Sequence, residues 1–432
     1  MKHLLFVEST GLGIHALEYA RKLGHRTTLL WSPSYDFFAA PEVRRQARES
    51  VDQAIRVEDI QDPVAVLAAL HGAGIHTGEI DAVLTTLHMC VLPAAELAEA
   101  IGALGTSREA INSARDKGRC RTILREQQIP SLGFAVVTEA AQALAAAAAI
   151  GYPVVVKPVS GLGKTVTAIA HSPQEVSAHF AQADARCAEL VPGLAAELDD
   201  RFIVEELAVG PLYSVEVATD GVSFTPLAAV RRKTGLDNPV LELGSTMPCG
   251  LDSEAERELG AYAVRVCRAL GLDLGIFHVE VIGTADGFRL VEVNPRIAGG
   301  TVPEVIRAAT GQNLFETLVT LFDGGPVPAE PYPVRTAASH TFLATAEDCT
   351  VRGDLPADWF EAFRPRLHSG DSSIEAGSRL RRMDGNFDTY GVVRVTAKDF
   401  ARAELDCTQI RSEIEELLGV RMTPVAPSGG PS

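Results

Sequence analysis

The sequence predicts a mixed α/β protein with two or three packed domains. A chain of 432 residues with 46% hydrophobic content is long enough for that number, and its 22% charged fraction is ordinary for a globular protein. Near the start, apolar runs at residues 4–7 and 27–31 flank a helical segment, which is the pattern of a β-α-β unit. Much later, residues 277–294 read as two strands around a turn at residues 285–287. A crossover helix at one end and a hairpin at the other indicate the mixed class.

The charge and the cysteines of the chain exclude several function classes. A formal net charge of −17 argues against non-specific binding to nucleic acid or to an anionic membrane, since both need basic patches. The seven cysteines are scattered and never spaced as C-x-x-C, so we expect neither a disulfide framework nor a zinc site. No apolar run approaches the length of a membrane span, and nothing marks the chain for export. We therefore expect a cytoplasmic protein whose partners are small molecules.

The first strand leads through a glycine turn into a helix over residues 14–23. Gly11, Gly13 and Ala16 satisfy the pattern G-x-G-x-x-A, which can hold a pyrophosphate at a helix N-terminus. A dinucleotide site also needs an acidic residue after the second strand, where this chain has Trp-Ser-Pro at residues 31–33. The pattern therefore favours a tight turn over a dinucleotide site.

Helices and strands alternate over the next part of the chain. Strands are expected at residues 82–86, 153–158 and 166–170, and helices at residues 92–101, 111–124 and 139–150. The helical segment at 111–124 is expected to run unbroken until shortly before Pro130. Lys157 ends the run Val-Val-Val-Lys-Pro, and a lysine in a buried strand needs an anionic partner. A nucleotide phosphate could be that partner.

A glycine-rich segment, Ser-Gly-Leu-Gly-Lys-Thr at residues 160–165, follows that strand directly. It is similar to a phosphate-binding Walker loop, but the first glycine of that pattern is missing, since Pro158 and Val159 stand there, and the next residues read as a strand rather than a helix. Two interpretations stay open at this point. The segment is either a mobile hairpin whose backbone N–H groups cover phosphates, or a plain flexible hairpin.

The second half of the chain contains more strands and a helical C-terminus. Strands are expected at residues 202–208, 213–218 and 225–230, and helices at residues 253–270, 302–309, 314–322 and near 408–418. The basic residues at 231–233 are expected in a solvated loop or facing an anion, and residues 244–250 are expected to form a loop. Residues 323–333 read as a linker, and residues 423–432 are expected to be disordered.

The hairpin carries one acid on each strand. Glu292 and Asn294 share a parity and so point to one face, and strand pairing can bring Glu280 beside them. Carboxylates in apolar strands resist burial unless a cation sits between them, and hard oxygen ligands suit Mg²⁺. Arg296 follows on the same parity and offers a guanidinium to an anion. The alternative is a surface hairpin with solvated acids.

Five features in this order resemble the ATP-grasp superfamily, and especially its carboxylate-amine ligases that act on amino acids. They are Asp-Lys at residues 116–117, Val-Val-Lys-Pro at 155–158, the glycine-rich segment at 160–165, Glu-Glu at 205–206, and the acids of the hairpin that ends in Asn-Pro-Arg at 294–296. The resemblance implies a Rossmann-like N-terminal domain over residues 1–105 and an ATP-grasp nucleotide-binding domain over residues 106–323. A small C-terminal lobe over residues 324–422 and the tail would complete the chain.

The resemblance also implies a role for individual residues. ATP with Mg²⁺ or Mn²⁺ is the implied cofactor pair, and Arg296 and Lys164 are the implied catalytic residues. The nucleotide would contact Lys117, Lys157, Gly161, Gly163, Lys164, Thr165, Glu205, Glu206, Leu207 and Ala208. The metal would be held by Glu280, Glu292 and Asn294, and the substrates by Arg231, His278, Arg296, Gly299 and Gly300. Relatives often carry an acid that bonds the ribose near position 212, where this chain has Leu212.

The resemblance implies a reaction that joins the carboxylate of an amino acid to an amine through an acyl phosphate. The products would be ADP, phosphate and a dipeptide or γ-glutamyl amide, and related ligases imply a homodimer. Two alternatives remain. One is a carboxylase-type enzyme that phosphorylates bicarbonate, and the other is a nucleotide-binding protein without catalysis.

Overall fold

A four-stranded parallel sheet forms the N-terminal part of the computed structural model, which describes residues 1–161, 163–164, 166–188, 190, 192–195 and 197–427. Its strands, in the order β3-β2-β1-β4, are β1 (His3–Val7), β2 (Arg26–Trp31), β3 (Gln53–Arg56) and β4 (Ala82–Leu84). The associated helices are α1 (Ile14–Lys22), η1 (Pro33–Phe38), α2 (Pro41–Glu49), α3 (Pro63–Gly72), η2 (Thr77–Glu79), η3 (His88–Cys90) and α4 (Val91–Ile101). All five residues of β1 are buried, as expected for a strand covered on both faces. The predicted β-α-β unit is confirmed.

The helical segment predicted at residues 111–124 is two helices, so the expectation of one unbroken helix was wrong. These are α5 (Arg108–Arg115) and α6 (Lys117–Glu126), and the backbone of Asp116 between them is extended. The Asp116 carboxylate accepts a hydrogen bond from the Arg119 backbone N–H at 2.8 Å, which caps the second helix. The break places Lys117 in the first turn of α6, where its N–H donates to the carbonyl of Val159 at 3.1 Å.

A second, antiparallel sheet has the order β5-β8-β6-β7. Its strands are β5 (Phe134–Val137), β6 (Val154–Pro158), β7 (Ala168–Ala170) and β8 (Phe202–Glu206), and its helices are α7 (Ala140–Ile150), α8 (Pro173–Ala188) and α9 (Pro192–Ala195). Val154, Val156 and Val204 are fully buried against small alanines of α7. The alanine-rich sequence of α7 therefore serves both helix propensity and close packing on the sheet.

The largest sheet has eight antiparallel strands in the order β13-β12-β9-β10-β11-β14-β18-β16. In that order the strands are β13 (Gly287–Asn294), β12 (Gly275–Thr284), β9 (Leu212–Thr219), β10 (Phe224–Thr234), β11 (Glu242–Met247), β14 (Ala337–Phe342), β18 (Gly391–Ala397) and β16 (Ser369–Ser372). The helices packed on it are α10 (Ser253–Ala269), α11 (Val302–Thr310), α12 (Leu314–Phe322) and α13 (Phe400–Leu418). Short elements complete the chain: β15 (Cys349–Thr350), β17 (Arg379–Leu380), η4 (Trp359–Ala362) and η5 (Arg364–Arg366).

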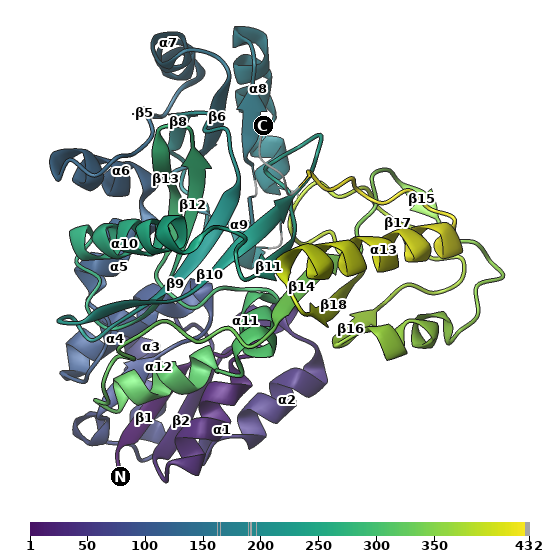
Figure 1. Ribbon diagram of the computed structural model, residues 1–432. Coiled ribbons are helices and arrows are strands. Elements are labelled where there is room, and N and C mark those ends of the chain that lie inside the picture. Colours follow the sequence, from purple (N-terminus) through teal and green to yellow (C-terminus); the bar gives the residue numbers. More distant parts are fainter. Residues whose placement is uncertain (162, 165, 189, 191, 196, 428–432) are drawn as a thin grey trace.

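The large sheet runs through the predicted boundary between the nucleotide domain and the C-terminal lobe. Figure 1 shows the lobe, in yellow and light green, extending sideways from the end of the sheet, with α13 over β14 and β18. At the other side, α12 packs on α1 and joins the N-terminal sheet to one shared apolar core. We keep residues 105 and 323 as proposed boundaries, since both lie between regular elements.

Four further expectations from the sequence were wrong in detail. The basic residues at 231–233 belong to strand β10, and most of the expected loop at 244–250 is strand β11. Helix α13 begins at Phe400 rather than near Thr408. Residues 423–427 of the expected disordered tail lie against β10 through backbone hydrogen bonds, and residues 428–432 lie outside the described part. Within the described part of the chain, no helix is long and apolar enough to cross a membrane.

The approach of β11 to β14 depends on a glycine. A Cβ built on Gly244 would lie 2.2 Å from the carbonyl oxygen of His340 on the neighbouring strand, so one of the two backbones would have to move. We predict that Gly244→Ala lowers the free energy of unfolding by about 1–3 kcal/mol. Gly78→Ala is the matched control, because nothing lies within 4 Å of a Cβ at that position. Urea unfolding followed by circular dichroism measures both, and equal midpoints would contradict the prediction.

Candidate active site

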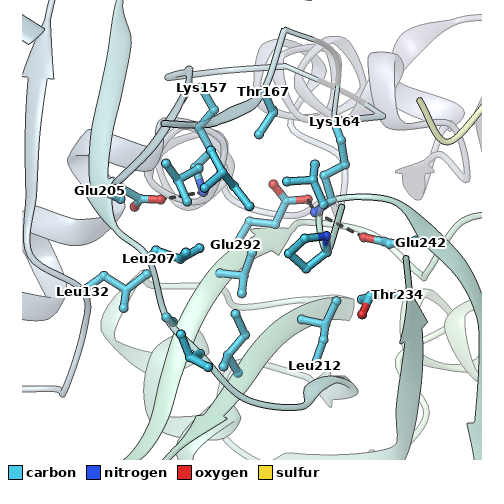
Figure 2. Close-up of a pocket in the computed structure, with 18 of the residues that line it drawn as sticks. Leu132, Lys157, Lys164, Thr167, Glu205, Leu207, Leu212, Thr234, Glu242 and Glu292 are labelled. Atoms are coloured by element: carbon cyan, nitrogen blue, oxygen red, sulfur yellow. Dashed lines mark ion pairs between the residues drawn. The ribbon is translucent and has the colours of Figure 1, made fainter. Parts of the chain in front are cut away.

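A cavity of about 330 Å³ opens between the small antiparallel sheet and the large one (Figure 2). The volume lies within the range of about 300–1,000 Å³ that is usual for small-molecule sites. Nine of the ten residues predicted to contact a nucleotide line it: Lys117, Lys157, Gly161, Gly163, Lys164, Glu205, Glu206, Leu207 and Ala208. The tenth, Thr165, lies outside the residues that the structure describes.

One end of the cavity contains a buried carboxylate between two cations. Glu205 on β8 contacts the Lys157 ammonium at 2.6 Å and the Arg121 guanidinium at 2.8 Å, and Arg121 is only 1% exposed. Burial raises the pKa of Glu205, but Arg121 and Lys157 outweigh it and hold that pKa below its usual value. Lys157 therefore has a protein carboxylate as its anionic partner, which leaves the other hydrogens of its ammonium for the cavity. Arg121 was not among the predicted site residues.

The segment after β8 provides the other wall at this end. Glu206, the last residue of β8, is exposed and hydrogen-bonded through its backbone N–H to the carbonyl of Gly133 at 2.9 Å. Leu207 and Ala208 continue along the cavity toward Leu212, which lies on the wall and brings no hydrogen-bonding group there. Figure 2 shows Leu132 and Leu207 at the Glu205 end of the cavity.

The hairpin acids converge beside the cavity, and Glu292 lines its wall between Glu205 and Glu242 (Figure 2). Glu280 on β12 and Glu292 on β13 are direct cross-strand partners, and the Asn294 amide donates to Glu292 at 3.3 Å. The Lys164 ammonium contacts Glu280 at 2.9 Å, Glu242 at 3.3 Å and Glu292 at 3.6 Å. A loop lysine therefore lies among three carboxylates that come from three strands.

Mutual electrostatics keep these groups charged. Burial raises the pKa of Glu280, but the Lys164 ammonium and the His278 side chain outweigh it, and the pKa lies well below its usual value. Burial also raises the pKa of Glu292, but nearby cations, chiefly the Lys164 ammonium, outweigh it and lower that pKa to about 2. For Lys164, burial lowers the pKa while the carboxylates of Glu280 and Glu292 raise it, and the net result is well above the ordinary value. The cluster thus stays ionised across the neutral pH range.

Behind the acids lies a second charged pair, which organises the backbone after β13. His278 Nδ1 lies 2.5 Å from the Glu216 carboxylate, and the second oxygen of Glu216 accepts the Ala298 backbone N–H at 3.1 Å. Burial lowers the pKa of His278, but Glu216 and Glu280 raise it to about 9. Glu216 was not selected from the sequence, although it is the acid of the segment Ser-Val-Glu at 214–216.

Arg296 lies beside the acids and contacts the N-terminal part of the chain. Its guanidinium donates to His88 Nδ1 at 3.2 Å, to the carbonyl of Ile297 at 2.7 Å and to the Asn294 amide oxygen at 3.4 Å. Gly299 lies against this guanidinium, since a Cβ there would be 3.6 Å from it, and Gly300 has a φ of +59°. The two glycines let the backbone pass closely around the arginine.

The structure does not bring Arg231 to this cavity. Arg231 donates to the Tyr213 hydroxyl at 3.1 Å and stacks on its ring, on the face of the sheet that α10 covers. Neighbouring residues of a strand point to opposite faces, so Arg232 lies on the cavity side and pairs with Glu242. The role of Arg231 at a substrate stays a prediction, and Arg232 is the member of the basic run that contacts Glu242, a residue of the cavity wall.

The donor set of the hairpin fits a magnesium ion. It offers carboxylate oxygens from Glu280 and Glu292 and an amide oxygen from Asn294, and the Lys164 ammonium shows that the place accepts a cation. Among the described residues, no group of three or more His, Cys, Asp or Glu side chains could hold a metal ion. The set therefore depends on its amide and on phosphate oxygens of a substrate, as is usual for Mg²⁺.

Comparison with protein families identifies the central part of the chain. Residues 150–304 match the family described as the ATP-grasp domain. This part of the chain, about a third of its length, is similar to the ATP-grasp domain. The matched residues include the valine-rich strand β6, the glycine-rich segment, β8 and the whole acidic hairpin.

Relatives and solved structures are similar over more of the chain. Carnosine synthase 1 from Gallus gallus is 28% identical over 358 residues, which are 79% of this chain and 37% of that protein. D-alanine–D-alanine ligase from Ectopseudomonas mendocina is 28% identical over 276 residues, which are 62% of this chain and 76% of that protein. This chain thus spans well under half the length of the carnosine synthase.

Two solved structures show the shared fold. An L-amino acid ligase from Bacillus licheniformis aligns with a TM-score of 0.74 at 17% identity and covers 96% of this chain and 98% of its own. A biotin carboxylase from Campylobacter jejuni aligns with a TM-score of 0.67 at 16% identity and covers 98% of this chain and 93% of its own. At such identities these likenesses establish a shared fold and nothing more.

The carboxylate between Lys157 and Arg121 yields a stability prediction. Glu205→Gln removes the only charge that compensates both cations in this contact, so we expect a loss of about 3 kcal/mol in the free energy of unfolding. Glu206→Gln is the matched control, since that side chain is exposed, and should change stability by less than about 0.5 kcal/mol. Urea unfolding measures both variants. If the Glu205→Gln protein were as stable as the Glu206→Gln protein, Glu205 would not compensate the two cations.

Proposed function

We propose that this protein is an ATP-dependent ligase that joins a carboxylate, an amino acid, to an amine and releases ADP and phosphate. The observation that carries the proposal is the convergence of Glu280 and Asn294 on Glu292, which lines a cavity together with three lysines. Acids alone would favour a cation site, and lysines alone would favour an anion site. Both together suit the metal-bound triphosphate of a nucleotide.

The nucleotide is proposed to occupy the cavity along its length. The backbone from Glu206 to Ala208 would meet the base, and Lys117 and Lys157 would meet the phosphates, because both ammonium groups line the cavity. Lys117 lies 3.6 Å from Glu292, which supports its place beside the metal end. Leu212 stands where a ribose contact is common in relatives, so the sugar would meet an apolar wall at this point.

Glu280, Glu292 and Asn294 would hold Mg²⁺, with Mn²⁺ as a substitute. When bound, the ion supplies charge neutralisation at the phosphates during attack by the substrate carboxylate. Arg296 would then stabilise the oxyanion that develops when the amine attacks the acyl phosphate. Lys164 and the glycines at 161 and 163 would cover the phosphates and keep water from that intermediate.

The substrates are proposed to lie beside Arg296, His278, Gly299 and Gly300. Arg296 and the two glycines border the same point of the backbone, and His278 is held next to Glu280 at 3.4 Å. The similarity to a carnosine synthase and a D-alanine–D-alanine ligase supports amino acids as substrates. A homodimer and a cytoplasmic location complete the proposal, and the scattered cysteines, none spaced as C-x-x-C, suit a reducing compartment.

The direct test is release of ADP and phosphate from Mg²⁺-ATP across a matrix of paired amino acids, with mass spectrometry of the products. The proposal predicts a signal that needs both members of a pair and a product one water lighter than their sum. Phosphate release that depends on bicarbonate instead would favour the carboxylase reading. Nucleotide binding with no turnover for any pair would favour a non-catalytic protein.

Loss of one charge from the metal set should abolish turnover. We predict that Glu292→Gln lowers kcat by on the order of 100-fold or more, because the phosphates lose an anionic metal ligand while the side-chain shape is kept. Glu258→Gln on the exposed side of α10 is the control and should keep full activity. Turnover is measured at saturating ATP with the pair found above, and thermal melting verifies that both variants are folded. Phosphate release by Glu292→Gln at the wild-type rate would remove Glu292 from the metal set.

A further inference from the structure

A short C-terminal segment, residues 423–426, runs along the end of strand β10. The Leu236 backbone N–H donates to the carbonyl of Pro424 at 2.8 Å, and the Ala426 N–H donates to the carbonyl of Thr234 at 2.8 Å. Between these two bonds, Gly235 and Val425 form an antiparallel bridge. The segment is therefore paired as a short strand next to the cavity, and its position is set by the backbone rather than by loose surface contacts.

Besides this pairing, the segment is anchored by contacts to the C-terminal lobe and to the residues at β11. Val425 packs against the buried residues Leu241, Leu243, Ala344 and Met383. The Thr423 N–H donates to the carbonyl of Ala344 at 2.9 Å, and Arg411 of α13 donates to the carbonyl of Thr423. Buried apolar contact and backbone pairing together hold the segment in one register.

The inner side of the segment belongs to the cavity wall. Ala426 lines the cavity together with Leu236, Pro239 and Val240, so the wall here is made of uncharged side chains. Figure 2 shows Thr234, which accepts the Ala426 hydrogen bond, across the cavity from Leu132. The segment thus forms the wall of the cavity opposite Leu132 and Leu207.

We propose that residues 423–426 are a built part of the nucleotide site and that the small side chain of Ala426 sets how tightly a nucleotide fits. The inference rests on the proposed nucleotide binding in this cavity. A methyl group at position 426 limits the cavity without filling it, and any larger side chain on this paired backbone would enter the space. Because Arg411 of α13 holds Thr423, the C-terminal lobe contributes to nucleotide affinity through this segment.

The test compares two tryptophan variants at adjacent positions. Ala426→Trp places an indole on the cavity side, and Pro427→Trp places the same bulk on an exposed residue next to the segment. Affinity for the non-hydrolysable analogue AMPPNP with Mg²⁺ is measured by calorimetry on the full chain, so the readout does not depend on knowing the substrates. We expect Ala426→Trp to weaken binding at least tenfold and Pro427→Trp to keep the wild-type affinity.

Two further variants keep the test decisive. If thermal melting shows that Ala426→Trp is unfolded, the smaller Ala426→Val is measured and should weaken binding by a lesser factor. Val425→Asn, which breaks the apolar anchor without adding bulk to the cavity, should also weaken binding. Wild-type affinity in all folded variants at 425 and 426 would overturn the proposed wall. Absence of AMPPNP binding to the wild-type protein would instead overturn the nucleotide site itself.

Discussion

Two carboxylates placed directly opposite each other on neighbouring strands are the constraint on which the rest of this site depends. Glu280 and Glu292 are cross-strand partners, and like charges in that position destabilise a sheet. They persist because the Lys164 ammonium lies among them, and its attraction to both carboxylates outweighs the cost of burying the charges. The glycine-rich segment is therefore tied to the acidic hairpin through one side chain. Any metal-nucleotide complex that enters must replace or share the role of this ammonium.

The same rule governs the neighbouring charges. Glu205 is compensated by Arg121 and Lys157, and Glu216 is compensated by His278 and a backbone N–H. Each acid links segments that are distant in the sequence. Glu205 connects the small sheet to α6, whose Arg121 reaches the backbone of β13, and Glu216 fixes the turn that carries Arg296. The rigidity of the site thus comes from compensated charges rather than from loop sequence alone.

Local patterns were enough to predict the hairpin, its parity and most helices, because these depend on residues close together in the chain. The partners of Glu205 and Glu216 could not be predicted, since Arg121 and Ala298 lie far away along the chain and meet them only after the sheets pair. The basic run at 231–233 shows the same limit. The run forms the end of β10. Only the pairing of β10 with β9 and β11 decides that Arg232 faces Glu242 and that Arg231 faces α10. The tail is polar and contains prolines, so its sequence did not predict a strand-like segment. The segment forms because Val425 packs against residues that only the folded chain brings together.

The central claim is that the acidic hairpin and the lysines serve phosphoryl transfer to a carboxylate. The most direct measurement uses an amino acid labelled with ¹⁸O at both carboxylate oxygens, with mass analysis of the phosphate released during ligation. Activation as an acyl phosphate makes one labelled oxygen the bridge between the carbonyl carbon and phosphorus. When the amine attacks that carbon, the bond from carbon to the bridging oxygen breaks and the label leaves with phosphate. The account predicts one ¹⁸O in each phosphate released. Unlabelled phosphate, formed while the amide product appears, would contradict it.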